Sequence, residues 1–383
     1  MTSHPPITAF TAIRLDHWKN FPNVDVALGP RAFLVGPNAS GKSNFLDAFR
    51  FLHDLVTEGG GLDHAARIRG RTRSIRTLTD PTDAPIHLGV SMKNDEETVW
   101  SYDLDFYGDQ EGRTVVRQER VRQGDLTILE RPNAQDRDDP ELLTQTALEQ
   151  VSANRPFRVI AEFFASIRYL HVVPHLIRAA ELAADRTNGD LGTEILKELA
   201  RLPGPTRSAR LKRIRTILRA AVPQLRDLEY WRDNMGRPHL RARFGDRGTD
   251  ESWQIEDRFS DGTLRLFGLI WAALDGDGPL LLEEPELSLN PSIVRLIPAM
   301  LFSAQRDARR QIILSTHSAE LLMDQGIGLD EVILFQVRDG ATIVRPASDF
   351  PDVLALLDAG MPLGEIVLPM VSPATSPQLV AAS

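Results

Sequence analysis

The stretch Gly36-Pro37-Asn38-Ala39-Ser40-Gly41-Lys42-Ser43 decides the fold of this chain, because it matches the pattern G-x-x-x-x-G-K-[ST] of loops that bind nucleotide phosphates. The apolar run at residues 32–35 predicts a buried strand before it, and residues 44–52 show helical periodicity after it. Glycines allow the backbone to turn its N–H groups toward phosphate oxygens, and the free amides that begin a helix favour a bound anion. We therefore expect a nucleotide-binding loop between a strand and a helix.

Each position of this loop has an expected role toward ATP and Mg²⁺. Lys42 is expected to reach the β- and γ-phosphates, and the hydroxyl of Ser43 is expected to ligate Mg²⁺. A chance glycine-rich turn is the alternative, and the flanking strand and helix disfavour it. The expected nucleotide contacts in this segment are Gly36, Pro37, Asn38, Ala39, Ser40, Gly41, Lys42, Ser43 and Asn44.

Length and composition set outer limits on the protein class. With 383 residues the chain can form a sizeable core and more than one subdomain. Its net charge of −9 is unlike that of a protein that coats nucleic acid along its whole surface. The absence of cysteine excludes disulfides and thiolate metal sites. No run of 18 apolar residues and no signal peptide are found, so we expect a cytoplasmic protein without a membrane partner.

A second group of chemically active residues follows the short apolar run at residues 279–282, which predicts another strand. The sequence after it is Glu283-Glu284-Pro285-Glu286. Carboxylates at the end of a buried strand beside a phosphate loop lie where Mg²⁺ and an attacking water must be held. Successive strand residues point to opposite sides, so Glu283 and Glu284 need not have the same role. An ordinary acidic loop after a strand is the alternative.

Two further segments lie near predicted element ends. Ser260-Asp261-Gly262-Thr263 precedes an apolar stretch at 266–274, and Ser260 or Asp261 is a suitable N-cap for that helix. Such a turn can bind an anion, although Ser-Asp-Gly is also a common turn sequence. His317 follows the apolar strand predicted at 311–315 and precedes an expected helix at 319–325. A lone histidine in that place is more often structural than catalytic.

The order of these four elements resembles the ABC-class ATPases, and in particular the RecF/SMC/OLD-like branch with its stand-alone bacterial members that carry a helical lid. The resemblance covers the chain from about residue 7 to about residue 365. It implies an α/β P-loop NTPase fold with an ABC-type head, a mixed central sheet, an antiparallel β subdomain and an inserted helical lid.

The resemblance also implies roles for individual residues. Glu284 polarises the hydrolytic water, Glu283 with Ser43 holds the metal, and His317 acts with Lys42 near the γ-phosphate. The signature turn formed by Ser260, Asp261, Gly262 and Thr263 contacts ATP bound to another copy, so two ATP molecules are enclosed in a head-to-tail homodimer. Residues 287–291 match the D-loop. The chain departs from this pattern at three points. Glu283 stands where aspartate is usual, and Asn290 stands at a D-loop position that is often His or Asp. None of Gln110, Gln118 and Gln123 can be assigned as the Q-loop glutamine.

The pattern of predicted elements divides the chain. We expect a nucleotide-binding lobe at 1–133 with an antiparallel meander over 86–130, a helical lid at 134–224, a second nucleotide-binding lobe at 225–370, and a disordered tail at 371–383. Helices of the lid are expected near 141–152, 157–168, 191–201 and 206–221. No heptad pattern runs through three repeats, so long coiled-coil arms are excluded.

Arginines cluster twice in the sequence although the total charge is negative. One cluster lies at residues 67–76 and the other on the helix expected at 206–221. Either could contact a phosphate backbone, and a solvated helix face is the ordinary alternative. Neither cluster has aromatic residues interleaved in its sequence. The members are Arg67, Arg69, Arg71, Arg73 and Arg76 in the first, and Arg207, Arg210, Lys212, Arg213, Arg215 and Arg219 in the second.

The expected activity is Mg-dependent ATP hydrolysis that drives dimerisation and conformational switching. By resemblance, the biological setting is DNA repair or anti-phage defence with a nuclease-like effector encoded separately, because fewer than 40 residues follow the last predicted hairpin. A higher oligomer and direct contact with DNA stay open. Two alternatives remain: a slow-turnover ATP-sensing scaffold that organises a nuclease-like partner, and the ATPase subunit of an ABC transporter.

Overall fold

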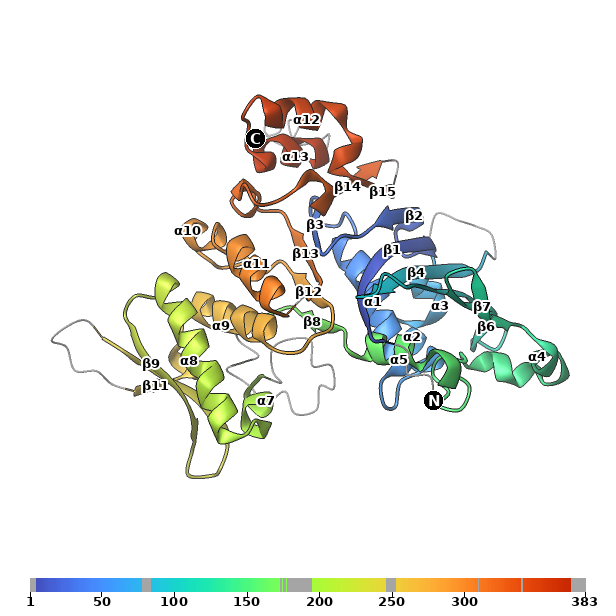
Figure 1. Cartoon of the computed structure of the whole chain (residues 1–383), viewed down its shortest axis with the longest axis horizontal. Helices are drawn as coiled ribbons and strands as arrows, with labels where there is room; N and C mark the ends of the chain where they lie inside the picture. Colours follow the sequence, from blue (N-terminus) through green and yellow to red (C-terminus); the bar gives the residue numbers. More distant parts are fainter. Residues whose placement is uncertain are drawn as a thin grey trace. The chain divides into compact units, whose positions relative to one another are not determined.

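A computed structural model describes residues 5–77, 84–172, 174, 177, 195–245, 253–308, 310–338 and 340–372 (Figure 1). The chain forms two compact units: unit 1 comprises residues 1–168, 277–281 and 308–383, and unit 2 comprises residues 169–276 and 282–307. The sequence-based boundaries at 133, 224 and 370 differ from this division and stay a prediction. Most of the expected tail, residues 373–383, lies outside the described residues.

An antiparallel sheet of unit 1 has the strand order β2-β1-β4-β5-β6-β7. The meander expected over residues 86–130 is confirmed, because β4 to β7 pair in sequence order. On β5 every second residue is buried, including Trp100, Tyr102 and Leu104, as expected for a strand with one face on the core. The strands are β1 Ile7–Trp18, β2 Phe21–Ala27, β4 Ile86–Asn94, β5 Val99–Gly108, β6 Thr114–Gln123 and β7 Leu126–Arg131.

The second large sheet is mixed and has the order β15-β14-β3-β13-β12-β8. Strand β3 pairs in parallel with β13 and β14, whereas β14 and β15 form an antiparallel hairpin. All residues of β3 are buried, which explains the continuous apolar sequence of residues 32–35. The chain passes between the two units within β12 and β8. The strands are β3 Arg31–Val35, β8 Arg168–Leu170, β12 Leu280–Glu283, β13 Ile312–Thr316, β14 Val332–Arg338 and β15 Ala341–Pro346.

Helix α1 (Lys42–Val56) is fixed to unit 1 by aromatic contacts on both sides. The ring of Phe45 lies 5.5 Å from that of Phe335 on β14, and the ring of Phe49 lies 4.9 Å from that of Phe10 on β1. Phe10 in turn contacts Phe163 of α5 (Arg158–Ala165) at 4.8 Å. Buried aromatic pairs stabilise beyond their area, so the helix that follows the phosphate loop has a rigid support.

The remaining helices of unit 1 confirm some expectations and contradict others. The helix expected at 157–168 is α5. The prediction of a helix at 141–152 was wrong. The structure has a short 3₁₀ helix, Pro140–Thr144, followed by turns. In these turns the Glu149 carboxylate accepts hydrogen bonds from the amide and the hydroxyl of Thr146. Side chains that bond the local backbone compete with helix formation. The helix expected at 319–325 is only a 3₁₀ turn, Leu321–Met323. The others are α2 Leu62–Arg67, α3 Arg71–Ile75, α4 Ala134–Asp138, α12 Pro351–Asp358 and α13 Leu363–Val371.

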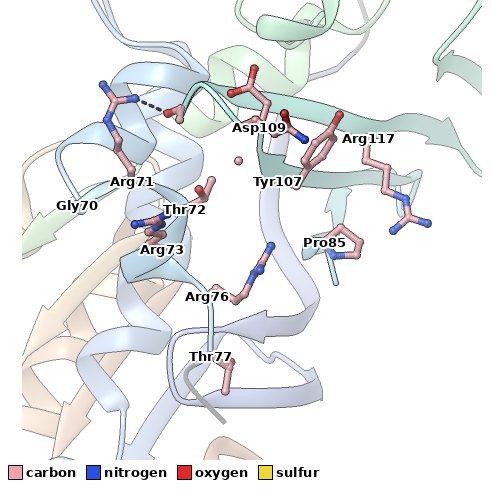
Figure 2. A pocket seen from close by; sticks show the side chains of 13 residues that line it. Gly70, Arg71, Thr72, Arg73, Arg76, Thr77, Pro85, Tyr107, Asp109 and Arg117 are labelled. Atoms are coloured by element: carbon pink, nitrogen blue, oxygen red, sulfur yellow. Dashed lines mark hydrogen bonds between the residues drawn. The ribbon is translucent and has the colours of Figure 1, made fainter. Parts of the chain in front are cut away.

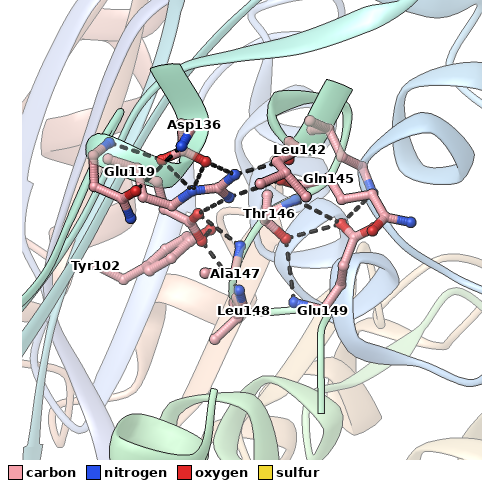
Figure 3. Close-up of polar contacts among 12 residues, drawn as sticks. Tyr102, Glu119, Asp136, Leu142, Gln145, Thr146, Ala147, Leu148 and Glu149 are labelled. Carbon is pink, nitrogen blue, oxygen red and sulfur yellow. Dashed lines mark hydrogen bonds and ion pairs between the residues drawn. The ribbon is translucent and has the colours of Figure 1, made fainter. Parts of the chain in front are cut away.

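A buried ion-pair network joins β6 to the segment that follows β7 (Figure 3). Arg131 Nη1 lies 3.1 Å from Glu119 Oε2, and Arg131 Nη2 lies 2.6 Å from Asp136 Oδ1. Glu119 also accepts hydrogen bonds from the amides of Ala147 at 2.7 Å and Leu148 at 3.1 Å. Burial raises the pKa of the Glu119 carboxyl, although these amides and Arg131 oppose the rise. The carboxylate therefore holds an otherwise irregular segment in place.

Replacing Glu119 by Ala is expected to destabilise the protein by about 3–5 kcal/mol, because it leaves the buried Arg131 guanidinium and two amides without their carboxylate partner. The urea midpoint of unfolding measures the change. Glu130→Ala is the matched control, since Glu130 pairs with Arg120 on the surface, where such pairs contribute at most about 1 kcal/mol. Equal midpoints for the two variants would show that the network is not a stabilising element.

Unit 2 contains a small antiparallel sheet of order β11-β10-β9 and a set of helices. Helix α8 packs on α9, where Arg210 bonds Asp275 at 2.5 Å and covers the ring of Trp271 at 4.9 Å. The helices expected at 191–201 and 206–221 correspond to α7 and α8, with residues 191–194 outside the described range. The elements are α7 Ile195–Arg201, α8 Gly204–Ala221, β9 Leu225–Arg232, β10 Pro238–Phe244, β11 Trp253–Ile255, α9 Asp261–Leu274, α10 Pro291–Val294 and α11 Ile297–Ala308.

Candidate nucleotide-binding site

The loop between β3 and α1 has a backbone that requires its two glycines. A Cβ atom on Gly36 would lie 2.6 Å from Ser40 Oγ and 2.8 Å from the Cβ of Phe335. Gly41 has a φ of 97°, in the left-handed region, and a Cβ there would lie 2.2 Å from the Asn20 side chain. Both positions therefore exclude larger residues. The predicted strand–loop–helix order is present.

Lys42 is the first residue of α1, and its side chain folds back over the loop. Its buried ammonium donates hydrogen bonds to the carbonyl oxygens of Gly36 at 2.8 Å and Pro37 at 3.0 Å. A lysine has three donors and no acceptor, so it can exchange these partners for phosphate oxygens that occupy the loop. The Ser43 side chain is exposed at the start of the helix, as a metal ligand must be. These features fit a bound nucleotide with Mg²⁺.

Two polar residues that the sequence analysis missed support the loop from behind. Asn20 donates to the carbonyl of Ser40 at 3.2 Å and accepts from the Asn44 amide at 2.6 Å. Thr342, from β15, donates to the same Ser40 carbonyl at 2.9 Å. Asn20 lies two strands before the loop and Thr342 follows it by some 300 residues, so no local motif could have identified them.

His317 lies at the same sheet edge as the loop. Strands β3 and β13 are parallel neighbours, and Thr316 pairs with Val35 at their carboxyl ends. The next residues are His317 and Gly36, so both leave the sheet side by side. The His317 side chain is exposed. Unit 1 thus brings together the loop, Lys42 and the predicted switch histidine, whereas the three glutamines considered for a Q-loop lie on β6 or in the turn before it.

The signature turn begins helix α9 in unit 2. Of the two expected N-cap candidates, Ser260 is the N-cap, and its hydroxyl accepts a hydrogen bond from the amide of Thr263 at 3.2 Å. The side chains of Ser260 and Asp261 are exposed, and Gly262 is half-buried. A Cβ on Gly262 would lie 3.2 Å from the carbonyl oxygen of Ser288, so the segment predicted as a D-loop packs against this turn. The exposed start of α9 can receive an anion from outside.

The carboxylates at the end of β12 and just after it differ in their surroundings. Glu283 accepts a hydrogen bond from the hydroxyl of Tyr169, another residue that the sequence did not indicate. Glu284 has a φ of 42°, which is strained for a residue with a side chain and is the kind of outlier found at functional sites. Arg265 of α9 is buried near the charges of Glu284 and Glu286; burial lowers the pKa of its guanidinium, and these acids oppose the fall. Sequence reasoning gave Arg265 no role.

The donor set fits a metal only together with a nucleotide. Within the ranges that the structure describes, no group of three or more His, Asp or Glu side chains is placed to hold a metal ion. Mg²⁺ is commonly bound by one or two protein oxygens plus substrate phosphates. Ser43, exposed at the start of α1, offers one protein oxygen of this kind in unit 1.

These features define a class of protein. A P-loop with its lysine on a mixed sheet, together with an antiparallel sheet, is the fold of SMC ATPase head domains. An SMC head bound to the C-winged helix domain of ScpA is similar with a TM-score of 0.55 at 14% identity, covering 89% of this chain and 99% of that one. The SMC head with an extended coiled coil derived from Pyrococcus furiosus has a TM-score of 0.52 at 12% identity, covering 91% and 99%.

The sequence itself matches a family model described as "AAA domain, putative AbiEii toxin, Type IV TA system" over residues 31–324. The chain therefore belongs to this family of P-loop ATPase domains. No curated protein matches the chain. In the described part of the chain, no helix is long and apolar enough to cross a membrane.

Proposed function

We propose that this protein hydrolyses ATP with Mg²⁺ and uses the cycle to switch between separate and paired copies. The observation that carries the proposal is the phosphate loop, in which the buried Lys42 ammonium is held over the carbonyls of Gly36 and Pro37. Such a loop binds phosphates through backbone amides and a fixed cation, which is the main requirement for phosphoryl transfer.

Each site residue has a proposed task in this activity. The loop from Gly36 to Asn44 holds the phosphates, and Ser43 and Glu283 hold Mg²⁺. When bound, Mg²⁺ neutralises phosphate charge and orients the phosphate oxygens. Glu284 orients the attacking water and takes up its proton, and His317 donates a hydrogen bond beside the γ-phosphate. Asn20 and Thr342 fix the loop backbone through the Ser40 carbonyl.

The proposed assembly is a homodimer in which each signature turn completes the partner's site. The turn is suited to this because Ser260 and Asp261 are exposed at a helix N-terminus. A γ-phosphate enclosed between Lys42 of one copy and the amides of residues 260–263 of another has its charge neutralised from both sides. Binding of ATP then favours the paired state, and hydrolysis favours separation.

The proposed setting is the cytoplasm, in DNA repair or anti-phage defence with a nuclease-like effector supplied by another chain. The family description names a type IV toxin–antitoxin system, and one similar SMC head is bound to a domain of ScpA. Both are two-component arrangements. They support the proposal that this chain acts with a partner protein.

Steady-state phosphate release tests the proposal. We expect Mg-dependent turnover that EDTA abolishes and that the effector or DNA changes. Tight ATP binding without turnover under all these conditions would instead favour the scaffold that only senses ATP. Stimulation by membrane vesicles alone would favour a transporter subunit.

A further inference from the structure

The turn that joins β1 to β2 in unit 1 has a strained backbone. His17 has a φ of 56° and Lys19 a φ of 50°, in the left-handed region that favours glycine. Neither position holds glycine, so the chain keeps two side chains there at a cost in backbone energy. Such outliers cluster at functional sites. We call residues 17–20 the clamp turn, because three of them in succession contact the phosphate loop or the helix that follows it.

Trp18 connects the clamp turn to the first turn of α1. Its side chain is fully buried, and its ring packs edge-on against that of Phe51, with centroids 5.4 Å apart. The indole Nε1 donates a hydrogen bond to the carbonyl oxygen of Asn44 at 2.9 Å. A buried indole N–H needs an acceptor, so this bond ties the turn to the residue that directly follows the loop.

Lys19 makes a charge-assisted contact to the same helix. Its ammonium lies 2.5 Å from Asp47 Oδ2, and Asp47 is buried and also accepts a hydrogen bond from Arg69 Nε at 3.0 Å. Burial alone would raise the pKa of the Asp47 carboxyl, but Arg69 and Lys19 hold this pKa below its usual range. The carboxylate therefore stays ionised and bonded to both cations. Arg69, a member of the first arginine cluster, is thus used inside the protein.

The segment after α3 holds the clamp turn on another side. The amide of Lys19 donates to the carbonyl of Ile75 at 2.5 Å, and the amide of Thr77 donates to the carbonyl of His17 at 3.1 Å. The hydroxyl of Thr77, which follows the end of α3 (Figure 2), donates to the carbonyl of Phe21 at 3.1 Å. The turn is therefore fixed before any ligand arrives, and its side chains have a rigid base.

We infer that the clamp turn positions the phosphate loop, because it holds the first turn of α1 where the helix amides can meet the phosphates of a nucleotide. The Lys19–Asp47 ion pair is the main tie, and the Trp18 indole is a second one. Asn20, the next residue of the turn, fixes the Ser40 carbonyl. The inference rests on the proposed nucleotide binding and adds positioning residues to it.

The physical reason is preorganisation. Backbone amides bind a phosphate well when they are ordered beforehand, because ordering them during binding costs affinity. The clamp turn supplies this order from one side of the helix, and the aromatic contacts of Phe45 and Phe49 supply it from others. Loosening the turn should therefore weaken binding of ATP even though α1 keeps its apolar packing.

Isothermal titration with ATP tests the inference. Lys19→Met keeps the aliphatic stem but removes the ammonium, and it should weaken ATP binding by roughly tenfold or more, as expected when a misplaced backbone meets its ligand. Lys19→Arg keeps the charge and should recover most of that loss. Trp18→Phe keeps a ring against Phe51 but loses one hydrogen bond, so it should weaken binding by about 2–10-fold.

Hydrogen exchange without nucleotide gives a second measure that does not depend on ATP. The amides of residues 45–47 should exchange faster in Lys19→Met than in the wild type, whereas those of residues 119–122 on β6 should not change. Glu119→Ala is the matched control, because it removes a buried ion pair of unit 1 that involves neither the clamp turn nor α1. At a temperature where this variant is folded, it should bind ATP like the wild type.

The inference is overturned if folded Lys19→Met binds ATP like the wild type, if Glu119→Ala loses as much affinity, or if exchange at residues 45–47 is unchanged. If Lys19→Met does not fold, Trp18→Phe provides the same test. A wild-type protein that does not bind ATP would instead contradict the proposed function, and the exchange measurement would still show whether the clamp turn orders the helix.

Discussion

Replacing Glu284 by Gln is expected to lower the rate of ATP hydrolysis by roughly 10²–10⁴-fold while ATP still binds, because an amide cannot accept a proton from the attacking water. The substitution keeps the size of the side chain, and the backbone at this position, with a φ of 42°, is equally accessible to Gln and Glu. ATP should therefore accumulate in the bound form. In the proposed cycle the protein then remains paired.

Phosphate release and size-exclusion chromatography with Mg-ATP measure the two effects. Glu365→Gln is the matched control, because Glu365 is an exposed glutamate in the first turn of α13 and has no proposed role. It should hydrolyse ATP at the wild-type rate and form no lasting dimer. If Glu284→Gln also hydrolyses ATP at the wild-type rate, another residue is the base.

Replacing Lys42 by Ala is expected to weaken ATP binding more than about 100-fold. Charge-assisted hydrogen bonds contribute about 1.5–3 kcal/mol each, and an ammonium that bridges two phosphates makes at least two of them. The lysine already makes two such bonds, to Gly36 and Pro37, so its position is fixed before the nucleotide arrives. Little ordering is then required on binding, and the gain in affinity is the difference between the charge-assisted bonds to phosphate and the two carbonyl bonds that they replace.

Isothermal titration with ATP measures the loss, and Lys93→Ala is the control. Lys93 is an exposed lysine of β4 that pairs with Glu97, so its removal should leave the dissociation constant unchanged. The melting temperature without nucleotide shows whether Lys42→Ala still folds. A folded Lys42→Ala protein that binds ATP like the wild type would place the nucleotide elsewhere.

Much of the fold and of the site could be predicted because the signals are local. The phosphate loop is contiguous, and its glycines, lysine and serine have meaning at fixed spacing. The meander over 86–130 has a period of two, and α5, α8 and α9 have a helical period. Ser260 is recognisable as one of two N-cap candidates, with Asp261, because a helical apolar stretch follows within a few residues.

What could not be predicted depends on contacts between distant residues. Asn20 and Thr342 support the loop and Tyr169 bonds Glu283, yet each is an ordinary residue in its own segment. The helix expected at 141–152 failed for the related reason that side chains such as Glu149 bond the local backbone. A charge pattern likewise cannot tell the internal Arg69 from its exposed neighbours.

Cross-linking between copies tests the central claim that one copy's signature turn meets the ATP of another. The chain has no cysteine, so single cysteines can be placed at the exposed Asn38 and Asp261 in separate Glu284→Gln proteins. With Mg-ATP and a short bismaleimide, the account predicts a product that joins Asn38→Cys of one copy to Asp261→Cys of the other, and no such product without ATP. An ATP-dependent dimer that never yields this product, or that joins only like positions, would contradict the account.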